Sequence, residues 1–349
     1  MVTIYDIAKK MRLSHTTVSM ALRNMPCVRD STRRKVTETA QKMGYRKNQI
    51  ALSLKQGVFK RIVLVVHSFE VYGELINSLD TLCGEAGYEL VLMHLEESPE
   101  KMRRTFRQIV DGGYAGCAAY FYNYAPIGDL VSEFIASGHP FVALNMPLDL
   151  EVRPGLFRLD VNPDVALENV LEALYSLGHR KIACSVMEPY FATSYPVEKY
   201  YKYVHLKKFL LNHSITLPWD PGFFYQSRYP IDYIQDGYEA SKRILTEKPG
   251  VSALLCKNDQ FAFGLMKGLS EEGIRVPEDL SLVASDNSKM AKFSVPSITS
   301  VDLRQKEMAH MVWNILRDEL GKHVFSEIAP PVILQGELFL RESIGPAKG

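Results

Sequence analysis

Cysteine is scarce in this chain, and long apolar runs are absent from it. The 349 residues include five cysteines, an odd number without any Cys-x-x-Cys spacing, which argues against a disulfide framework or a zinc site. No apolar segment approaches the length of a membrane span, and the N-terminus lacks the charged-then-apolar pattern of a signal peptide. We therefore expect a cytoplasmic protein with no membrane partner, no metal and no other cofactor.

The signatures of the common enzyme classes are also missing. The sequence contains no Gly-x-Ser-x-Gly elbow, no phosphate-binding Gly-x-x-x-x-Gly-Lys and no His-Glu-x-x-His. The run Gly84-Glu85-Ala86-Gly87 has too few glycines, and lies too late after a strand-like run, to be a dinucleotide fingerprint. The sequence thus predicts a protein that is not an enzyme.

Positive charge is unevenly distributed, although the whole chain carries only +1 at pH 7. Residues 1–60 contain thirteen Lys or Arg against three acids. This is a surplus of about ten positive charges, and it leaves about nine negative charges in excess on the remainder. A basic module neutralises phosphates and releases their counterions, whereas an acidic body stays off the nucleic-acid backbone. The asymmetry predicts that the first 60 residues bind nucleic acid.

Within this basic segment, apolar residues recur at helical spacing. The pattern predicts a short amphipathic helix over 4–11 and a second helix over 15–22, which Ser14 can cap. A third helix is expected over 30–43, with Gly44 as its left-handed stop. A capped helical pair alone occurs in many small domains, but the third helix and the basic charge favour a helix-turn-helix that enters the DNA major groove.

The outer face of the second helix supplies the side chains offered to DNA. His15 and Thr16 are expected to reach base edges, because the N-terminal end of a recognition helix points into the major groove. Met20, one turn later, suits an apolar contact such as a thymine methyl; the alternative is that it only covers apolar surface. The residues expected to hold phosphates and set the register are Thr17, Ser19 and Arg23.

Five segments of this region resemble, in order, the headpiece and hinge of the lactose/galactose repressor (LacI/GalR) family. They are Thr3-Ile-x-Asp-Ile-Ala8, Leu13-Ser-x-Thr-Thr-Val-Ser-x-Ala-Leu22, Val28-x-x-Ser-Thr-Arg-x-Lys-Val36, Met43-Gly-Tyr-x-x-Asn48 and Ala51-x-Ser-Leu-Lys55. Later matches are Gly178 to Ala183, Asn258-Asp259, Arg275 to Val283, Ser297 to Val301 and Arg341-Glu342-Ser343. The resemblance covers nearly the whole chain.

Beyond residue 60, strand-like apolar runs alternate with helical patterns, which is typical of α/β proteins with parallel sheets. The clearest runs are 62–66, 90–93, 141–144, 182–186, 253–255 and 280–284. The resemblance implies a periplasmic-binding-protein-like core of two subdomains joined by three crossovers. The expected segments are an all-α helix-turn-helix headpiece over 1–46, a hinge over 47–60, and an effector-binding core over 61–345, with an N-subdomain at about 61–160 and 291–325 and a C-subdomain at about 161–290 and 326–345.

The resemblance also implies how the protein assembles on DNA. In the hinge, Leu54 would enter the minor groove as an apolar wedge beside Ser53 and Lys55, whereas the alternative is a plain linker leucine. Paired headpieces on a double-stranded DNA operator imply a homodimer. The chain has no room for a heptad tail after Arg341-Glu342-Ser343, so we expect dimers and not tetramers.

Ligands of such a core bind between the subdomains, beyond the carboxyl ends of the strands. By resemblance, Tyr72 packs on the effector; the alternative is a half-buried core tyrosine. Asn258 and Asp286 follow apolar strands and match effector-contacting positions. Asn145 occupies a similar strand end, and Asp160 begins a changed Asp-Asn-x-x-Gly motif. Asn258, Asp286 and Asn145 could each instead cap a following helix.

An arginine that the resemblance leads us to expect at the ligand is replaced by Lys202, within Tyr200-Tyr201-Lys202-Tyr203. A lysine cannot make the planar bidentate clamp of an arginine, so the ligand geometry should differ. The effector could be a sugar, a sugar phosphate or a nucleobase. We expect a transcriptional regulator, and a repressor in particular, that this effector controls. The alternatives are a solute-binding protein of the same fold and an α/β enzyme with a DNA-binding appendage.

Overall fold

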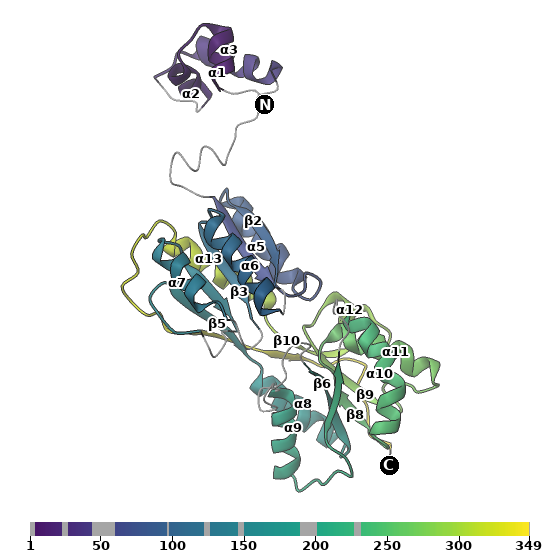
Figure 1. Ribbon diagram of the computed structural model, residues 1–349. Coiled ribbons are helices and arrows are strands. Elements are labelled where there is room, and N and C mark those ends of the chain that lie inside the picture. Colours follow the sequence, from purple (N-terminus) through teal and green to yellow (C-terminus); the bar gives the residue numbers. More distant parts are fainter. Residues whose placement is uncertain are drawn as a thin grey trace. The chain divides into compact units, whose positions relative to one another are not determined.

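The computed structural model describes residues 4–22, 27–43, 60–95, 98–121, 126–145, 150–188, 201–226 and 232–348. The chain forms two compact units, Met1–Phe59 and Lys60–Gly349, which are described separately (Figure 1). The boundary between them lies at the end of the basic segment. Among the described residues, no helix is long and apolar enough to cross a membrane.

The described residues of the first unit form three short helices, α1 (Ile4–Met11), α2 (His15–Leu22) and α3 (Asp30–Lys42). Ser14 caps α2, because its Oγ accepts the Thr17 N–H at 3.0 Å. The apolar faces of the three helices meet in one small core, whose buried members are Ile7, Ala8, Val18, Ala21, Val28, Val36 and Ala40. The predicted helices and the cap are confirmed.

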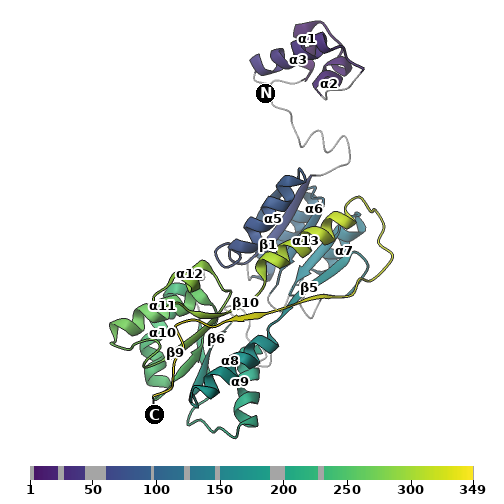
Figure 2. The ribbon, with the colours of Figure 1, turned by 180° about the vertical axis from the view of Figure 1, so that it is seen from behind.

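The second unit begins with a parallel six-stranded sheet in the order β11-β5-β4-β3-β1-β2. Its strands are β1 (Arg61–Val66), β2 (Glu89–His94), β3 (Gly116–Tyr120), β4 (Phe141–Leu144), β5 (Leu156–Asn162) and β11 (Val332–Gln335). Its helices are α5 (Gly73–Glu85), α6 (Pro99–Asp111), α7 (Gly128–Ala136) and α13 (Gln305–Glu319). The helices α5 and α13 lie side by side (Figure 2). We call this sheet with its helices the first lobe.

The second lobe is built on a six-stranded sheet in the order β12-β10-β9-β8-β6-β7. Its strands are β6 (Ile182–Glu188), β7 (Gly222–Gln226), β8 (Ala253–Leu255), β9 (Ser281–Ser285), β10 (Thr299–Asp302) and the antiparallel β12 (Glu337–Phe339). Its helices are α8 (Asp164–Ser176), α9 (Tyr201–Asn212), α10 (Tyr233–Glu247), α11 (Asp259–Glu271) and α12 (Lys289–Phe293). The predicted apolar runs 182–186, 253–255 and 280–284 correspond to β6, β8 and β9.

The helices α10 and α11 pack unusually closely. A Cβ added at Gly264 would overlap the Ile234 carbonyl oxygen, and one at Gly237 would overlap that of Phe261. Only glycine allows the two backbones to approach this far. The pair therefore forms a rigid cover on one face of the second sheet.

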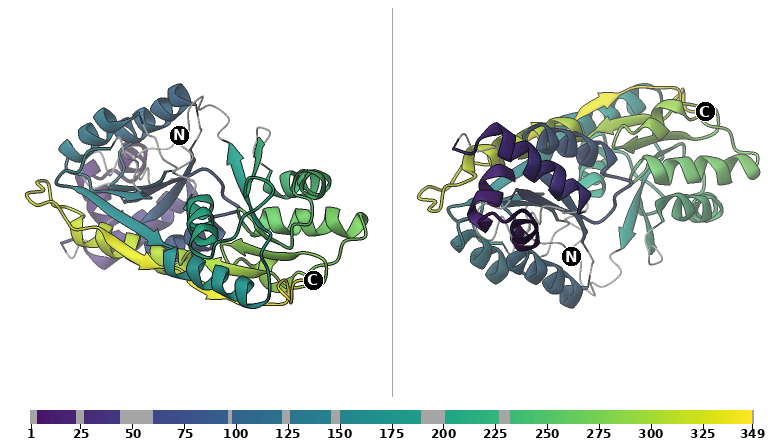
Figure 3. Two further views of the ribbon diagram at one scale, coloured as in Figure 1. Left: turned by 90° about the horizontal axis from the view of Figure 1, so that it is seen from below. Right: turned by 90° about the horizontal axis from the view of Figure 1, so that it is seen from above.

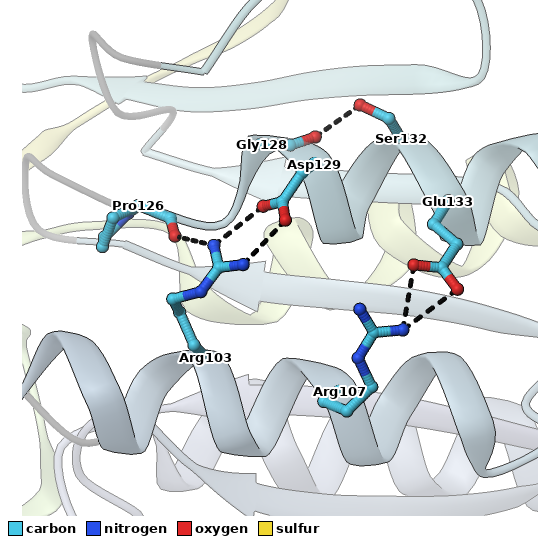
Figure 4. A network of polar contacts seen from close by, with 7 residues as sticks. All are labelled: Arg103, Arg107, Pro126, Gly128, Asp129, Ser132 and Glu133. Atoms are coloured by element: carbon cyan, nitrogen blue, oxygen red, sulfur yellow. Dashed lines mark hydrogen bonds and ion pairs between the residues drawn. The ribbon is translucent and has the colours of Figure 1, made fainter.

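In the first lobe, α6 and α7 are joined by a ladder of exposed ion pairs (Figure 4). The Arg103 guanidinium donates to both Asp129 carboxylate oxygens at 2.8 and 2.7 Å, and Arg107 Nη1 contacts both oxygens of Glu133 at 3.0 and 2.9 Å. The Arg103 bond holds the pKa of Asp129 down at about 2. The second pair lies one helical turn after the first on both helices, so the two pairs together fix the register of α6 and α7.

Three crossovers join the lobes: 162–164, 302–305 and 335–337. They pack against one another, since Gly336 N–H donates to the Asn162 carbonyl at 2.9 Å and a Cβ at Gly336 would lie 3.2 Å from Pro163 Cα. Seen from below, the yellow strands β11 and β12 run along the edges of both sheets (Figure 3).

The sheets divide the C-terminal part of the chain differently from the expected subdomain limits. The strand β10 pairs with β9 in the second lobe, although 291–325 was assigned to the N-subdomain. Conversely, β11 pairs with β5 in the first lobe, although 326–345 was assigned to the C-subdomain. The cause is that a short apolar run indicates a strand without indicating which of two sheets accepts it.

Candidate functional site

The exposed face of α2 carries the predicted base readers. His15 and Thr16 are exposed at its N-terminal end. The His15 ring lies 5.3 Å from that of Tyr5, which is 63% exposed on α1. The sequence analysis missed Tyr5, although its place on the polar side of the first helix was a usable signal. The surface therefore offers an imidazole, a phenol and a hydroxyl together.

The other predicted DNA-contacting residues differ in burial and in the contacts that they already make. Thr17 Oγ1 lies 2.8 Å from Ser14 Oγ, and Ser19 is half-buried. Met20 packs against the core of the first unit, with the Cys27 sulfur 3.8 Å from its own. This packing agrees with the alternative interpretation, in which Met20 covers apolar surface. The predicted residues Arg23, Ser53, Leu54 and Lys55 lie outside the described part of the chain.

In the second unit, Tyr72 lies buried just before α5, at the carboxyl edge of the first sheet. Its ring is 4.5 Å from that of Tyr120 and 5.0 Å from that of His67. Burial raises the pKa of Tyr120 to about 12, and the charges of Asp286 and Asp160 act in the same direction. His67 and Tyr120 lie at the ends of the adjoining strands β1 and β3, and Tyr72 precedes the helix that follows β1, so the three rings form an aromatic wall.

His67 is uncharged in this wall. Burial lowers its pKa well below 6.5, and the positive charge of Lys257 and the imidazole of His94 lower it further. The predicted residue Asn145 has φ of 54°, and its Nδ2 donates to the Phe121 carbonyl at 2.8 Å. Asn145 thus ties two strand ends together, and this structural bond competes with its predicted role at the ligand.

Facing this wall, the second lobe presents a half-buried cation, Lys202, beside the carboxyl group of Asp286. Lys202 Nζ donates to the carbonyls of Cys256 and Lys257 at 2.6 and 2.9 Å. Burial lowers the pKa of Lys202, while the nearby carboxylate of Asp286 opposes this. Burial raises the pKa of Asp286 well above its usual value, and the neighbouring charge of Asp259 raises it further. The two predicted residues therefore act on one another at the end of the second sheet.

Asn258 caps α11, because its Oδ1 accepts the Phe261 N–H at 2.9 Å. The side-chain oxygen of Asn258 therefore caps the helix, as the alternative states, and its Nδ2 amide is the group left for a ligand. The next residue, Asp259, was missed although it shares the Asn-Asp pair. It is 1% exposed, and its carboxylate accepts from Ser300 Oγ and Ser288 N–H, both at 2.7 Å.

Residues of both lobes meet across this site. The charge of Asp286 acts on Tyr120, and that of Lys257 acts on His67. At the rim, Gln260 Nε2 donates to Glu70 at 3.2 Å. The arrangement combines aromatic faces, phenolic hydroxyls and the carboxyl groups of Asp286 and Asp259. Among the described residues, no cluster of three or more His, Cys, Asp or Glu side chains is arranged to hold a metal ion.

Comparisons with known proteins agree with this architecture. Residues 3–48 match the family of bacterial regulatory proteins of the lacI type, and residues 171–344 match the periplasmic binding protein-like domain. The HTH-type transcriptional repressors PurR of Haemophilus influenzae strain PittEE and of Pasteurella multocida are 28% and 26% identical, and each match covers 99% of both chains.

Solved structures share the fold. The lac repressor dimer bound to operator and the anti-inducer ONPF has a TM-score of 0.75 at 19% identity, with 98% of each chain covered. The complex of the transcriptional regulator CelR with cellobiose has a TM-score of 0.67 at 20% identity, covering 98% of this chain and all of the other. These likenesses confirm the predicted α/β fold with a helix-turn-helix headpiece. The chain thus has the domain composition of a LacI-family transcriptional regulator: a headpiece of the lacI type is followed by a periplasmic-binding-protein-like domain, and the whole chain is similar to HTH-type transcriptional repressors.

Proposed function

We propose that the protein is a cytoplasmic repressor that binds its operator as a homodimer and releases or holds it according to a small ligand between the two lobes. One observation carries this proposal: a helix-turn-helix unit is linked to a two-lobed unit whose facing residues, such as Tyr120 and Asp286, interact across the lobes. A ligand in that position changes operator affinity only through its different affinity for the two forms of the protein.

The ligand is uncharged under this proposal. A helix N-terminus normally attracts anions, but several helices that follow the parallel strands carry an acid of their own in the first turn. These acids are Glu74 in α5, Asp164 in α8, Asp236 in α10 and Asp259 in α11. A phosphate would therefore meet carboxylates, while Lys202 is already engaged by two carbonyls, so we propose a sugar or nucleobase and not a sugar phosphate.

The proposed contacts follow from the chemistry of the site. Asp286 accepts hydrogen bonds from ligand hydroxyls or ring N–H groups, and Asn258 and Asp160 add polar contacts. The faces of Tyr72 and Tyr120 pack on a sugar ring or a base. On DNA, His15 and Thr16 read bases, and Leu54 of the hinge remains the proposed minor-groove wedge.

The test pairs operator binding with a ligand screen. An operator selected from random DNA is used in gel shifts, and melting temperatures are measured with matched neutral and phosphorylated compounds, for example ribose and ribose 5-phosphate. A ligand that binds the native state raises the melting temperature. We expect a neutral compound to do so and to change operator affinity.

In Asp286→Ala, that response should be lost while operator affinity without ligand is kept. The exposed Asp111→Ala, at the end of α6, is the control and should respond like the wild type. Calorimetry that shows full ligand affinity in Asp286→Ala would contradict the role of this carboxyl.

A further inference from the structure

Two consecutive residues beside the site between the lobes have left-handed backbones, although neither is glycine. Asp286 has φ of 102° and Asn287 has φ of 51°. Such conformations persist only where the surroundings hold them. Here Asp286 N–H donates to the Val301 carbonyl at 2.9 Å, and Asn287 N–H donates to Ser300 Oγ at 3.0 Å. The turn between β9 and α12 is therefore held in place by β10.

The side chain of Asn287 connects this turn to a crossover between the lobes. Its Nδ2 donates to Asp302 Oδ2 at 3.1 Å, while its Oδ1 accepts from the Arg341 guanidinium. The second carboxylate oxygen of Asp302 accepts the Arg304 N–H at 2.6 Å. Arg304 also has a left-handed backbone, with φ of 57°. Asp302 thus holds the turn with one oxygen and the crossover with the other.

Gln305 extends the connection into the first lobe. It is the first residue of α13 and is 6% exposed. Its Nε2 donates to the Val71 carbonyl at 2.8 Å, and its Oε1 accepts the Leu75 N–H at 3.3 Å. These two bonds bracket Tyr72 at the start of α5. An unbroken path therefore joins the ligand candidates of the opposite lobes, Asp286 and Tyr72, through Asn287, Asp302, Arg304 and Gln305.

We propose that Asn287 is a positioning residue that couples the occupancy of Asp286 to the crossover 302–304, and through Gln305 to the start of α5. The proposal rests on the proposed function, because it assumes that a ligand contacts Asp286. A ligand that draws this carboxyl toward itself must rotate a turn that is bonded on its other side to the crossover. Coupling of this kind travels through contiguous bonded groups whose equilibrium both sites bias.

The experiment measures amide hydrogen exchange in the full chain, without DNA or ligand. Asn287→Asp sets two carboxylates against each other and breaks the bond to Asp302. We expect the Leu75 amide, in the other lobe, to exchange at least about tenfold faster, because Gln305 loses its anchor. Asp302→Asn is the second single variant, for use where Asn287→Asp fails to fold, and we expect the same direction of change.

The decisive variant is the double variant in which the Asn and the Asp change places. Asn287→Asp combined with Asp302→Asn restores the donor and the acceptor in reversed order, so Leu75 exchange should return to within about twofold of the wild type. A role limited to the stability of the turn itself would leave Leu75 exchange unchanged in both single variants. Arg341→Met is the matched control, since it removes the other bond to the Asn287 side chain and leaves the bond to Asp302; Leu75 should exchange as in the wild type.

Three results would overturn the coupling: unchanged Leu75 exchange in both single variants, no rescue in the double variant, or an effect of Arg341→Met as large as that of Asn287→Asp. The proposed function is tested separately by gel shift with the selected operator. Hydrogen exchange is measured without DNA. A failure to bind operator would therefore contradict the proposed function, while the exchange result would still test the coupling.

Discussion

At the scale of single residues, His67 makes the cleft sensitive to acid. Its pKa is lowered by burial, by Lys257 and by His94, so the folded protein keeps this ring neutral. The unfolded chain binds a proton near pH 6.5, and between that pH and the lowered pKa it therefore binds more protons than the folded state. The stability that depends on His67 is present above pH 6.5 and is lost as the pH falls below it.

We therefore predict a specific effect of His67→Gln. Each pH unit below about 6.5 should cost the wild type up to about 1.4 kcal/mol of unfolding free energy through this one group. The variant should lose less stability over the same interval. Urea unfolding at about pH 7 and about pH 5 measures the difference. Equal losses in the two proteins would contradict the assignment.

Met20 is the residue whose two interpretations are easiest to separate. If it reads a base, Met20→Arg should change the preferred base at one symmetric pair of operator positions, by the equivalent of about 1–3 kcal/mol. Binding-site selection on both proteins measures this shift. Thr37→Arg, on the exposed side of α3, adds the same charge as a control and should leave the preferred bases unchanged. An unchanged motif in Met20→Arg would show that Met20 only covers apolar surface.

Part of the site between the lobes could be predicted from the sequence, because polar residues that follow apolar strands can be recognised without a structure. Asp286 and Lys202 were found in this way or by resemblance, and the structure brings them together. His67 and Tyr120 were missed, although they lie at the ends of β1 and β3, because an aromatic residue at a strand end is as typical of a core as of a site. Their shared wall depends on strand order, which no local pattern encodes.

At the scale of elements, the contact between α10 and α11 depends on glycine. We predict that Gly264→Ala destabilises the protein by about 3 kcal/mol or more, because the new methyl group meets the Ile234 backbone and the helices must separate. Denaturant unfolding measures the loss.

A matched control for this change is Gly84→Ala, near the end of α5. A Cβ at Gly84 meets nothing within 4 Å, so this variant should gain up to about 1 kcal/mol from helix propensity. Similar stabilities of the two variants would show that the helices tolerate a wider spacing than the structure has.

The helices and strands that the sequence analysis placed were predictable because their signals are local. The headpiece helices have capping residues and a 3.6-residue period, and the strands of both lobes are compact apolar runs. The predicted run 253–255 corresponds residue for residue to β8, which is flanked by strands on both sides. The limits of the subdomains at β10 and β11 were wrong because pairing across hundreds of residues decided them.

At the scale of the whole molecule, pairing of two chains is the next expectation. Each headpiece reads only a half-site, and two-fold symmetry matches a near-palindromic operator. We predict that light scattering at micromolar concentration shows a dimer. Gel shifts in which the protein is mixed with a version of different length should show two chains on each operator. A monomer that still binds the operator tightly, or a stable tetramer, would contradict this.

The interleaving of the two lobes has a consequence for synthesis on the ribosome. When residue 302 has been translated, the first sheet has five of its six strands but lacks α13 and its edge strand β11, and the second sheet lacks β12. Residues 305–339 then complete both sheets nearly at once. A nascent chain therefore acquires its headpiece early and both lobes late and together. Any message that stops short of this segment yields a headpiece without two finished lobes.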